Sequence, residues 1–125
     1  MFLQRVFFSF LMSVFIWVVP ASGHHSHGNY FINDYTLLEG TVREVHWINP
    51  HTWIYLEVQG ENGESTMWAL EGGSVAAVSN RGWESDDIVA GDRIKVRCHA
   101  LRDLSPGCLL GFVTTEDGIV DREFD

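Results

Sequence analysis

The stretch Thr52–Gln59, which reads Thr-Trp-Ile-Tyr-Leu-Glu-Val-Gln, decides the expected fold. Every second side chain is apolar, and these side chains share one face of an extended chain: Ile54, Leu56 and Val58. The opposite face carries the residues between them: Trp53, Tyr55 and Glu57. Strict alternation over this length predicts a half-buried β-strand whose apolar face lines the core.

Strand-like segments lie on both sides of this stretch. Leu38–Ile48 is rich in β-branched residues, and Asn49-Pro50-His51 joins it to the next strand through a tight turn. Gly60–Gly63 contains an Asn-Gly hairpin signal and leads into a third strand, Glu64–Glu71. The first half of the domain therefore predicts three consecutive antiparallel strands.

The hydrophobic period then changes from strand to helix and back. A short helix is expected at Val75–Arg81, with Ser74 as its N-cap and Gly82 at its end. Two more strands follow, Arg93–His99 and Cys108–Thr115. The order β-β-β-α-β-β predicts an all-β fold with one short helix, a five-stranded OB-like Greek-key barrel. A small open β-sandwich is the alternative, and the loops are too short for parallel α/β crossovers.

The N-terminal residues 1–23 have the pattern of a secretory signal peptide. Arg5 precedes an apolar run over residues 6–19, which is too short to span a membrane comfortably, and small residues follow. Cleavage after Gly23 would make His24 the first residue, whereas cleavage after Ala21 would leave Ser22 first. We expect a periplasmic or secreted protein without a stable membrane anchor after cleavage; an uncleaved anchor is the alternative.

Removing 23 of the 125 residues leaves 102, enough for a single small domain. We expect a His-rich lead-in over residues 24–35 and the barrel over residues 36–125. The barrel would end in an acidic tail that frays, with Ile119 and Val120 as candidates for a short extra strand. The chain has 17 acidic and 8 basic residues and a net charge of −9, which argues against nucleic acid or an anionic membrane as its main partner.

Several short segments together resemble a family of small exported bacterial proteins of unknown function. The most specific is Trp47–Leu56, which contains Asn-Pro-His between two tryptophans. The others are His24-His25-Ser26, Gly40-Thr41-Val42, Trp68–Ser74, Arg81-Gly82-Trp83 and Gly91-Asp92. The resemblance implies an OB-like barrel outside the cytoplasm and supplies no activity. His27 and the two cysteines depart from the family pattern, so it lends them no support.

Histidines are the strongest chemical signal, because imidazole binds copper, zinc and nickel well. The six are His24, His25, His27, His46, His51 and His99. A mature N-terminal His24 offers its α-amine and ring Nδ1 to one copper ion, and a third nitrogen would complete a T-shaped site. The alternative Ser22-Gly23-His24 terminus also chelates Cu(II) or Ni(II), through amine, amide and imidazole nitrogens. A polar tail without metal function is the other interpretation.

Three more histidines are expected at one rim of the barrel. His46 and His51 flank the Asn-Pro-His turn, and His99 ends the fourth strand, so the rim loops would bring them together. His51 is the preferred ligand because its motif is the specific one. The lead-in, however, enters the first strand at the opposite end, so His24 would have to run back along the barrel to reach His51.

Aromatic residues around the same turn form a second candidate site. Trp53 and Tyr55 share the face opposite the core and are expected to contact a ligand, together with Trp47 and Asn49 at the turn. Packing of the rim by large side chains is the structural alternative. The acidic side chains on the strand faces are expected to be solvated: Glu44, Glu57 and Glu71.

Cys98 and Cys108 flank a nine-residue loop between the last two strands. In an oxidising compartment this spacing favours a disulfide, and a thiolate copper site with His99 is the alternative.

The pattern as a whole favours a binding protein over an enzyme. No nucleophile elbow, phosphate loop or zinc-protease motif occurs in the sequence. The leading hypothesis is a small exported OB-fold protein that binds copper. The alternative is a metal-free module that binds a small ligand or another periplasmic protein through its aromatic rim. A copper oxidoreductase is a third possibility.

Overall fold

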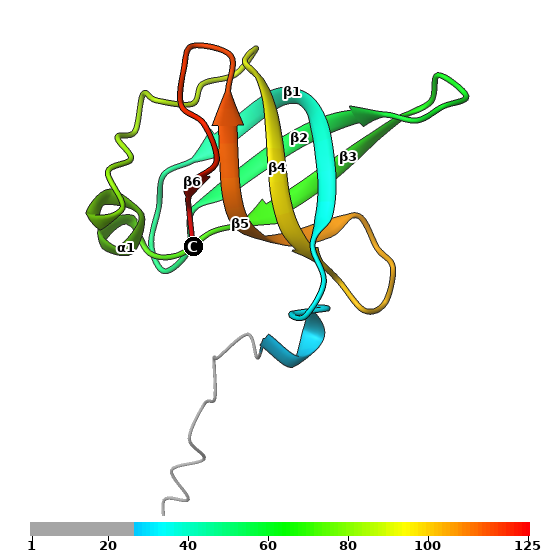
Figure 1. Cartoon of the computed structure of the whole chain (residues 1–125), viewed down its shortest axis with the longest axis horizontal. Coiled ribbons are helices and arrows are strands. Elements are labelled where there is room, and N and C mark those ends of the chain that lie inside the picture. The colour runs from blue at the N-terminus through cyan, green and yellow to red at the C-terminus, as the bar shows by residue number, and fades with distance from the viewer. Residues whose placement is uncertain (1–26) are drawn as a thin grey trace, which may run out of the picture.

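A computed structural model describes residues 27–125, so the expected signal peptide and the residues His24, His25 and Ser26 lie outside the described part of the chain. Six strands form one sheet in the order β3-β2-β1-β4-β5-β6, and a parallel pairing of β3 with β5 closes the first five into a barrel (Figure 1). The strands are β1 (Thr36–His46), β2 (Trp53–Gln59), β3 (Ser65–Glu71), β4 (Arg93–Ala100), β5 (Gly107–Thr115) and β6 (Arg122–Glu123). The expected OB-like barrel is confirmed, and the open sandwich is not formed.

The alternation predicted for β2 determines which of its side chains enter the core. Ile54 and Leu56 are fully buried, whereas Trp53 and Tyr55 on the other face are half-buried. Buried side chains from β1, β3, β4 and β5 meet them inside the barrel: Val42, Leu70, Ile94, Val96, Leu110 and Val113. Burial of this apolar surface is the main driving force for the fold.

The helix α1 (Val75–Asn80) follows β3 and precedes β4 along the chain, as expected from the sequence (Figure 1). Its N-cap, Ser74, accepts a hydrogen bond from the backbone N–H of Ala77 at 3.1 Å. The helix ends one residue before the predicted boundary, because Arg81 is already the C-cap, and Gly82 follows with a φ of +89°. A short 3-10 helix, η1 (His27–Asn29), precedes the barrel.

The C-terminal tail packs against the barrel, and the expectation that it frays is wrong. The extra strand forms at Arg122–Glu123 rather than at Ile119 and Val120, and it pairs with β5. Phe124 is only 1% exposed, and its ring lies 5.3 Å from that of Trp83. An acidic tail is anchored here because one aromatic side chain reaches the core.

The N-terminal end of β1 and the loop between β4 and β5 lie together at the point where the barrel closes. Cys98 and Cys108 form a disulfide there with a Cα–Cα distance of 5.6 Å, as predicted. Tyr30 pairs with Leu101 through an isolated β-bridge, so the lead-in runs beside this loop. Between residues 27 and 125, no helix is long and apolar enough to cross a membrane.

Candidate functional site

A buried carboxylate, Glu71, is the centre of the candidate site. It is the last residue of β3 and lies opposite Trp53 in β2 and Leu109 in β5. The residue is only 3% exposed, so the prediction of a solvated side chain is wrong. A carboxylate removed from water must receive hydrogen bonds, because its desolvation is otherwise very unfavourable. Two side chains that are distant in the sequence meet this requirement, Tyr30 and His51.

Tyr30 approaches Glu71 from the lead-in. Its hydroxyl donates a hydrogen bond to Oε2 of Glu71 at 2.5 Å, and its side chain is buried. Burial raises the pKa of the Tyr30 hydroxyl well above its usual value, and the hydrogen bond and negative charge of Glu71 add to this effect. Arg102 donates to the backbone carbonyl of Tyr30 at 3.1 Å. The tyrosine is therefore a protonated donor, fixed at both its backbone and its hydroxyl.

His51 approaches Glu71 from the Asn-Pro-His turn, whose Asn49–Pro50 peptide bond is cis. Its ring Nδ1 lies 3.1 Å from the carbonyl oxygen of Gly72 and 3.3 Å from Oε1 of Glu71. Both of these atoms are acceptors, so the Nδ1 atom must carry the proton. In the neutral form of this ring, the other nitrogen, Nε2, carries the lone pair that a metal ligand requires.

The cluster of Tyr30, Glu71 and His51 removes the geometric obstacle that the sequence suggested. Tyr30 stands only three residues after His27 and makes its contact next to the Asn-Pro-His turn. The lead-in reaches this turn because the pairing of β3 with β5 brings the end of β3 to the β4–β5 loop, beside which Tyr30 lies. The chain therefore does not have to run back along the whole barrel.

The other histidines have different neighbours. His46 Nε2 lies 2.9 Å from Oε2 of Glu44, and its ring packs edge-on against Tyr55 at 5.1 Å. His99 Nδ1 lies 2.9 Å from the carbonyl oxygen of Asp34 and stacks on Tyr35 at 4.4 Å.

No group of three or more His, Cys, Asp or Glu side chains in residues 27–125 is placed to hold a metal ion. The described residues therefore do not bring His46, His51 and His99 together as a set of three ligands. His24 and His25 lie outside the described residues, and only the backbone of His27 is described, as the first residue of η1.

The aromatic and amide residues at the turn divide between surface and structural positions. Trp53 lies between His46 and Glu71 in one row across β1, β2 and β3, on the outer face of the barrel. Trp47 packs against the core. The side-chain oxygen of Asn49 accepts a hydrogen bond from the backbone N–H of Val75 at 3.0 Å, so this residue holds the start of α1.

The cysteines carry no metal chemistry in this state. Both sulfur atoms belong to the disulfide, and no free cysteine remains in residues 27–125. A thiolate copper site with His99 is thus not available while the disulfide is formed. The role of this pair is to join the ends of β4 and β5 beside the lead-in.

The fold and the cluster define a small OB-like barrel whose N-terminal lead-in is anchored to a buried carboxylate beside a histidine. The chain belongs to a family of unknown function, DUF6152, whose model matches residues 13–109. The match includes Tyr30, His51 and Glu71. Comparison with curated proteins and with solved structures gives no match.

Proposed function

We propose that this protein is a small exported binding protein that holds a copper ion between its mature N-terminal histidine, His24, and His51. The observation that carries the proposal is the contact of Tyr30 and His51 with the same buried carboxylate, Glu71. This contact places the lead-in next to His51, the histidine of the Asn-Pro-His motif.

The segment between Tyr30 and His24, the expected first residue of the mature chain, is short. His24 stands six positions before Tyr30, and an extended segment of this length spans at most about 20 Å. Because the hydroxyl of Tyr30 already contacts Glu71, the segment can bring His24 to His51 without being fully extended. His25 and His27 lie in the same segment and are additional nitrogen donors for the same ion.

The chemistry of the donor set favours copper. After cleavage, the α-amine and ring nitrogen of His24 would supply two nitrogens, and Nε2 of His51 would supply a third. Nitrogen ligands of this kind bind Cu²⁺ more tightly than the other divalent first-row metals. Glu71 would support His51 as a ligand, because a carboxylate at the second ring nitrogen of a ligating histidine fixes the tautomer and orientation of that ring.

Export is supported by two independent features. Residues 1–23 have the pattern of a signal peptide, and the Cys98–Cys108 disulfide is typical of proteins in oxidising compartments. Export also matters for the chemistry, because only cleavage creates a free α-amine at His24.

Copper titration of the processed protein tests the proposal. Calorimetry and electron paramagnetic resonance should report one Cu(II) per chain, bound at least about tenfold more weakly when a Met is added before His24. His51→Ala should weaken binding by a similar factor, whereas His46→Ala is the matched control and should not. Binding no tighter than that of a free peptide of residues His24–Asn33 would refute the proposal, because the folded domain would then add nothing.

Glu71→Gln tests the role assigned to the carboxylate. Loss of such an outer partner typically weakens metal binding about 10- to 100-fold, and the spectrum should shift as the ring orientation relaxes. Glu57→Gln makes the same chemical change on the outer face of β2 and should leave copper affinity unchanged. An unchanged affinity in Glu71→Gln would remove Glu71 from the site and leave the roles of His24 and His51 intact.

A second candidate function is metal-free binding through the outer face of β1 and β2. Trp53 and Tyr55 are half-buried there beside His46, so their rings are accessible to a sugar, a peptide or another periplasmic protein. If this function is correct, apo protein binds such a ligand and Trp53→Ala abolishes the binding. Trp68→Ala, in the neighbouring strand β3, is the control.

A further inference from the structure

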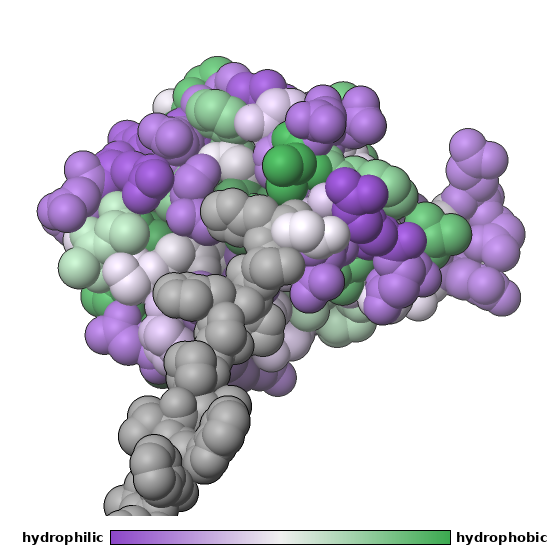
Figure 2. Space-filling view, turned by 90° about the horizontal axis from the view of Figure 1, so that it is seen from below, coloured by the Kyte–Doolittle hydropathy of each residue, from purple (hydrophilic) through white to green (hydrophobic). Residues whose placement is uncertain are grey.

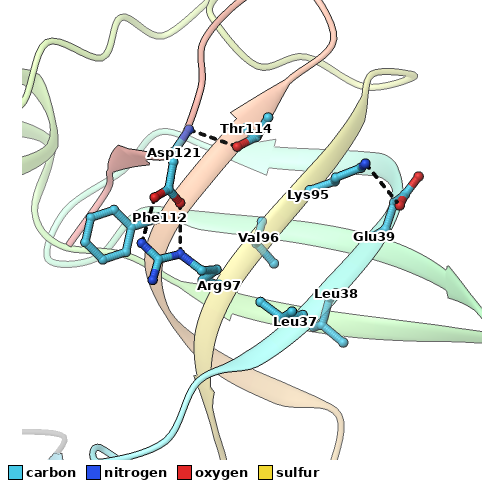
Figure 3. A pocket seen from close by; sticks show the side chains of 9 residues that line it. All are labelled: Leu37, Leu38, Glu39, Lys95, Val96, Arg97, Phe112, Thr114 and Asp121. Atoms are coloured by element: carbon cyan, nitrogen blue, oxygen red, sulfur yellow. Dashed lines mark hydrogen bonds and ion pairs between the residues drawn. The ribbon is translucent and has the colours of Figure 1, made fainter.

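A hollow in the described surface lies away from the Tyr30–Glu71–His51 cluster, on the outer side of β1, β4 and β5. It is a groove of about 620 Å³, a volume within the usual range for small-molecule sites (Figure 3). The side chains that matter for its chemistry are Leu37, Glu39, Lys95, Arg97, Phe112 and Asp121. They come from three neighbouring strands and from the loop that follows β5.

One part of the groove is apolar. Leu37, the second residue of β1, is 73% exposed. Leu37 pairs across the sheet with Arg97, which in turn pairs with Phe112 in β5, so the three form one row. The guanidinium carbon of Arg97 lies 4.2 Å from the centre of the Phe112 ring. Figure 2 shows one face of the molecule, on which hydrophilic and hydrophobic residues are mixed.

The other part of the groove carries charged side chains of both signs. Arg97 is neutralised by Asp121 through two hydrogen bonds of 2.8 Å (Figure 3). Glu39 accepts two hydrogen bonds from Arg93, at 2.9 and 3.0 Å, and these bonds hold the pKa of the Glu39 carboxyl below its usual range.

Lys95 is left with the weakest pairing in the groove. Its Nζ atom lies 3.8 Å from Oε2 of Glu39, a carboxylate already engaged by Arg93, and the side chain is 68% exposed. The groove lining thus holds two basic and two acidic side chains, and Lys95 is the basic one that is held most loosely. Lys95 is also the only lysine in the sequence. A cation in this position attracts an anionic group, and the row of Leu37 and Phe112 beside it attracts an apolar one.

We propose that this groove binds a small amphiphilic carboxylate, with its apolar body on Leu37 and Phe112 and its carboxylate on Lys95. The site is separate from the copper site and does not depend on it. Such a ligand would cover the exposed leucine and pair the loosely held ammonium of Lys95 in one step. Arg97 would stay paired with Asp121 and lie under the apolar body, between Leu37 and Phe112.

Calorimetric titration with dodecanoate, below its micelle concentration, tests the proposal on the purified protein with and without copper. We expect one dodecanoate per chain, and much weaker binding of dodecyltrimethylammonium, which has the same chain and the opposite charge. Lys95→Gln should weaken dodecanoate about fivefold, the scale of an exposed charge pair. Arg43→Gln removes the same charge from another part of the barrel and should have no effect.

A second variant tests the apolar half. Leu37→Asp places a carboxylate where the apolar body would lie and should abolish binding, whereas Leu104→Asp makes the same change at a residue 83% exposed in the β4–β5 loop and should not. Because both leucines are exposed, circular dichroism should show both variants folded. The proposal is overturned if dodecanoate does not bind, if it binds equally to Lys95→Gln, or if the cationic amphiphile binds as tightly.

Discussion

Replacing Tyr30 with Phe tests whether the lead-in is held by the buried carboxylate. The change removes one oxygen atom and leaves the ring in place, so it creates almost no cavity. What it removes is the 2.5 Å hydrogen bond to Glu71, a residue that is only 3% exposed. A hydrogen bond to a charged group contributes about 1.5–3 kcal/mol, and the variant would leave Oε2 of Glu71 buried without the hydroxyl that donates to it. We therefore expect Tyr30→Phe to lower the free energy of unfolding by about 2 kcal/mol.

Urea denaturation of the metal-free processed protein, followed by tryptophan fluorescence, measures this change. With a slope of about 1–3 kcal/mol per molar urea for a small domain, the midpoint should fall by about 1 M. Tyr55→Phe makes the same change on the half-exposed outer face of β2 and should alter stability by less than about 0.5 kcal/mol. A double-mutant cycle with Glu71→Gln should give a coupling energy of at least about 1 kcal/mol.

The same interaction has a defined pH dependence. The pKa of Tyr30 is raised in the folded state, so the folded protein binds this proton more tightly than the unfolded chain does. Its contribution to stability is complete below the unfolded tyrosine pKa of about 10 and declines as the pH rises through the folded value. The difference between wild type and Tyr30→Phe should therefore shrink above about pH 10. A difference below about 0.5 kcal/mol at pH 7 would show that Tyr30 does not anchor the lead-in.

Three further changes test the structure at other points. Phe124→Ala should lower stability by about 3–5 kcal/mol in urea denaturation, because this tail residue is buried; a loss below about 1 kcal/mol would mean that the tail is loose. Reduction of the bond between Cys98 and Cys108 should cost about 2–3 kcal/mol through the entropy of the released loop, and thiol labelling before reduction should find no reactive sulfur. Asn49→Ala should cost about 1 kcal/mol, measured by thermal unfolding, because the first N–H of α1 loses its acceptor; unchanged stability would show that this bond does not hold the helix.

The elements of the barrel were predictable because their signals are local. The alternation in Trp53–Gln59 fixed which side chains face the core, and Ser74 marked the start of α1. The first strand begins at Thr36, two residues before the predicted Leu38, because its early residues pair with β4, and pairing partners are not encoded locally. The disulfide was also accessible from sequence, since two cysteines on adjacent strands, in a chain that the sequence predicts to be exported, have few other partners.

The sequence by itself therefore determined the fold class, the order of the elements and the residue types available for metal binding. Only the tertiary structure decided which of these residues meet. Tyr30 and Glu71 are 41 residues apart, and Asn49 and Val75 are 26 apart, so no periodicity or motif connects either pair. Closure of the barrel through β3 and β5 brings the lead-in to Glu71, and the glutamate that the strand pattern alone assigned to solvent is buried there. The position of a polar side chain depends on what packs over it, and in this protein the covering residue, Tyr30, comes from outside the barrel strands.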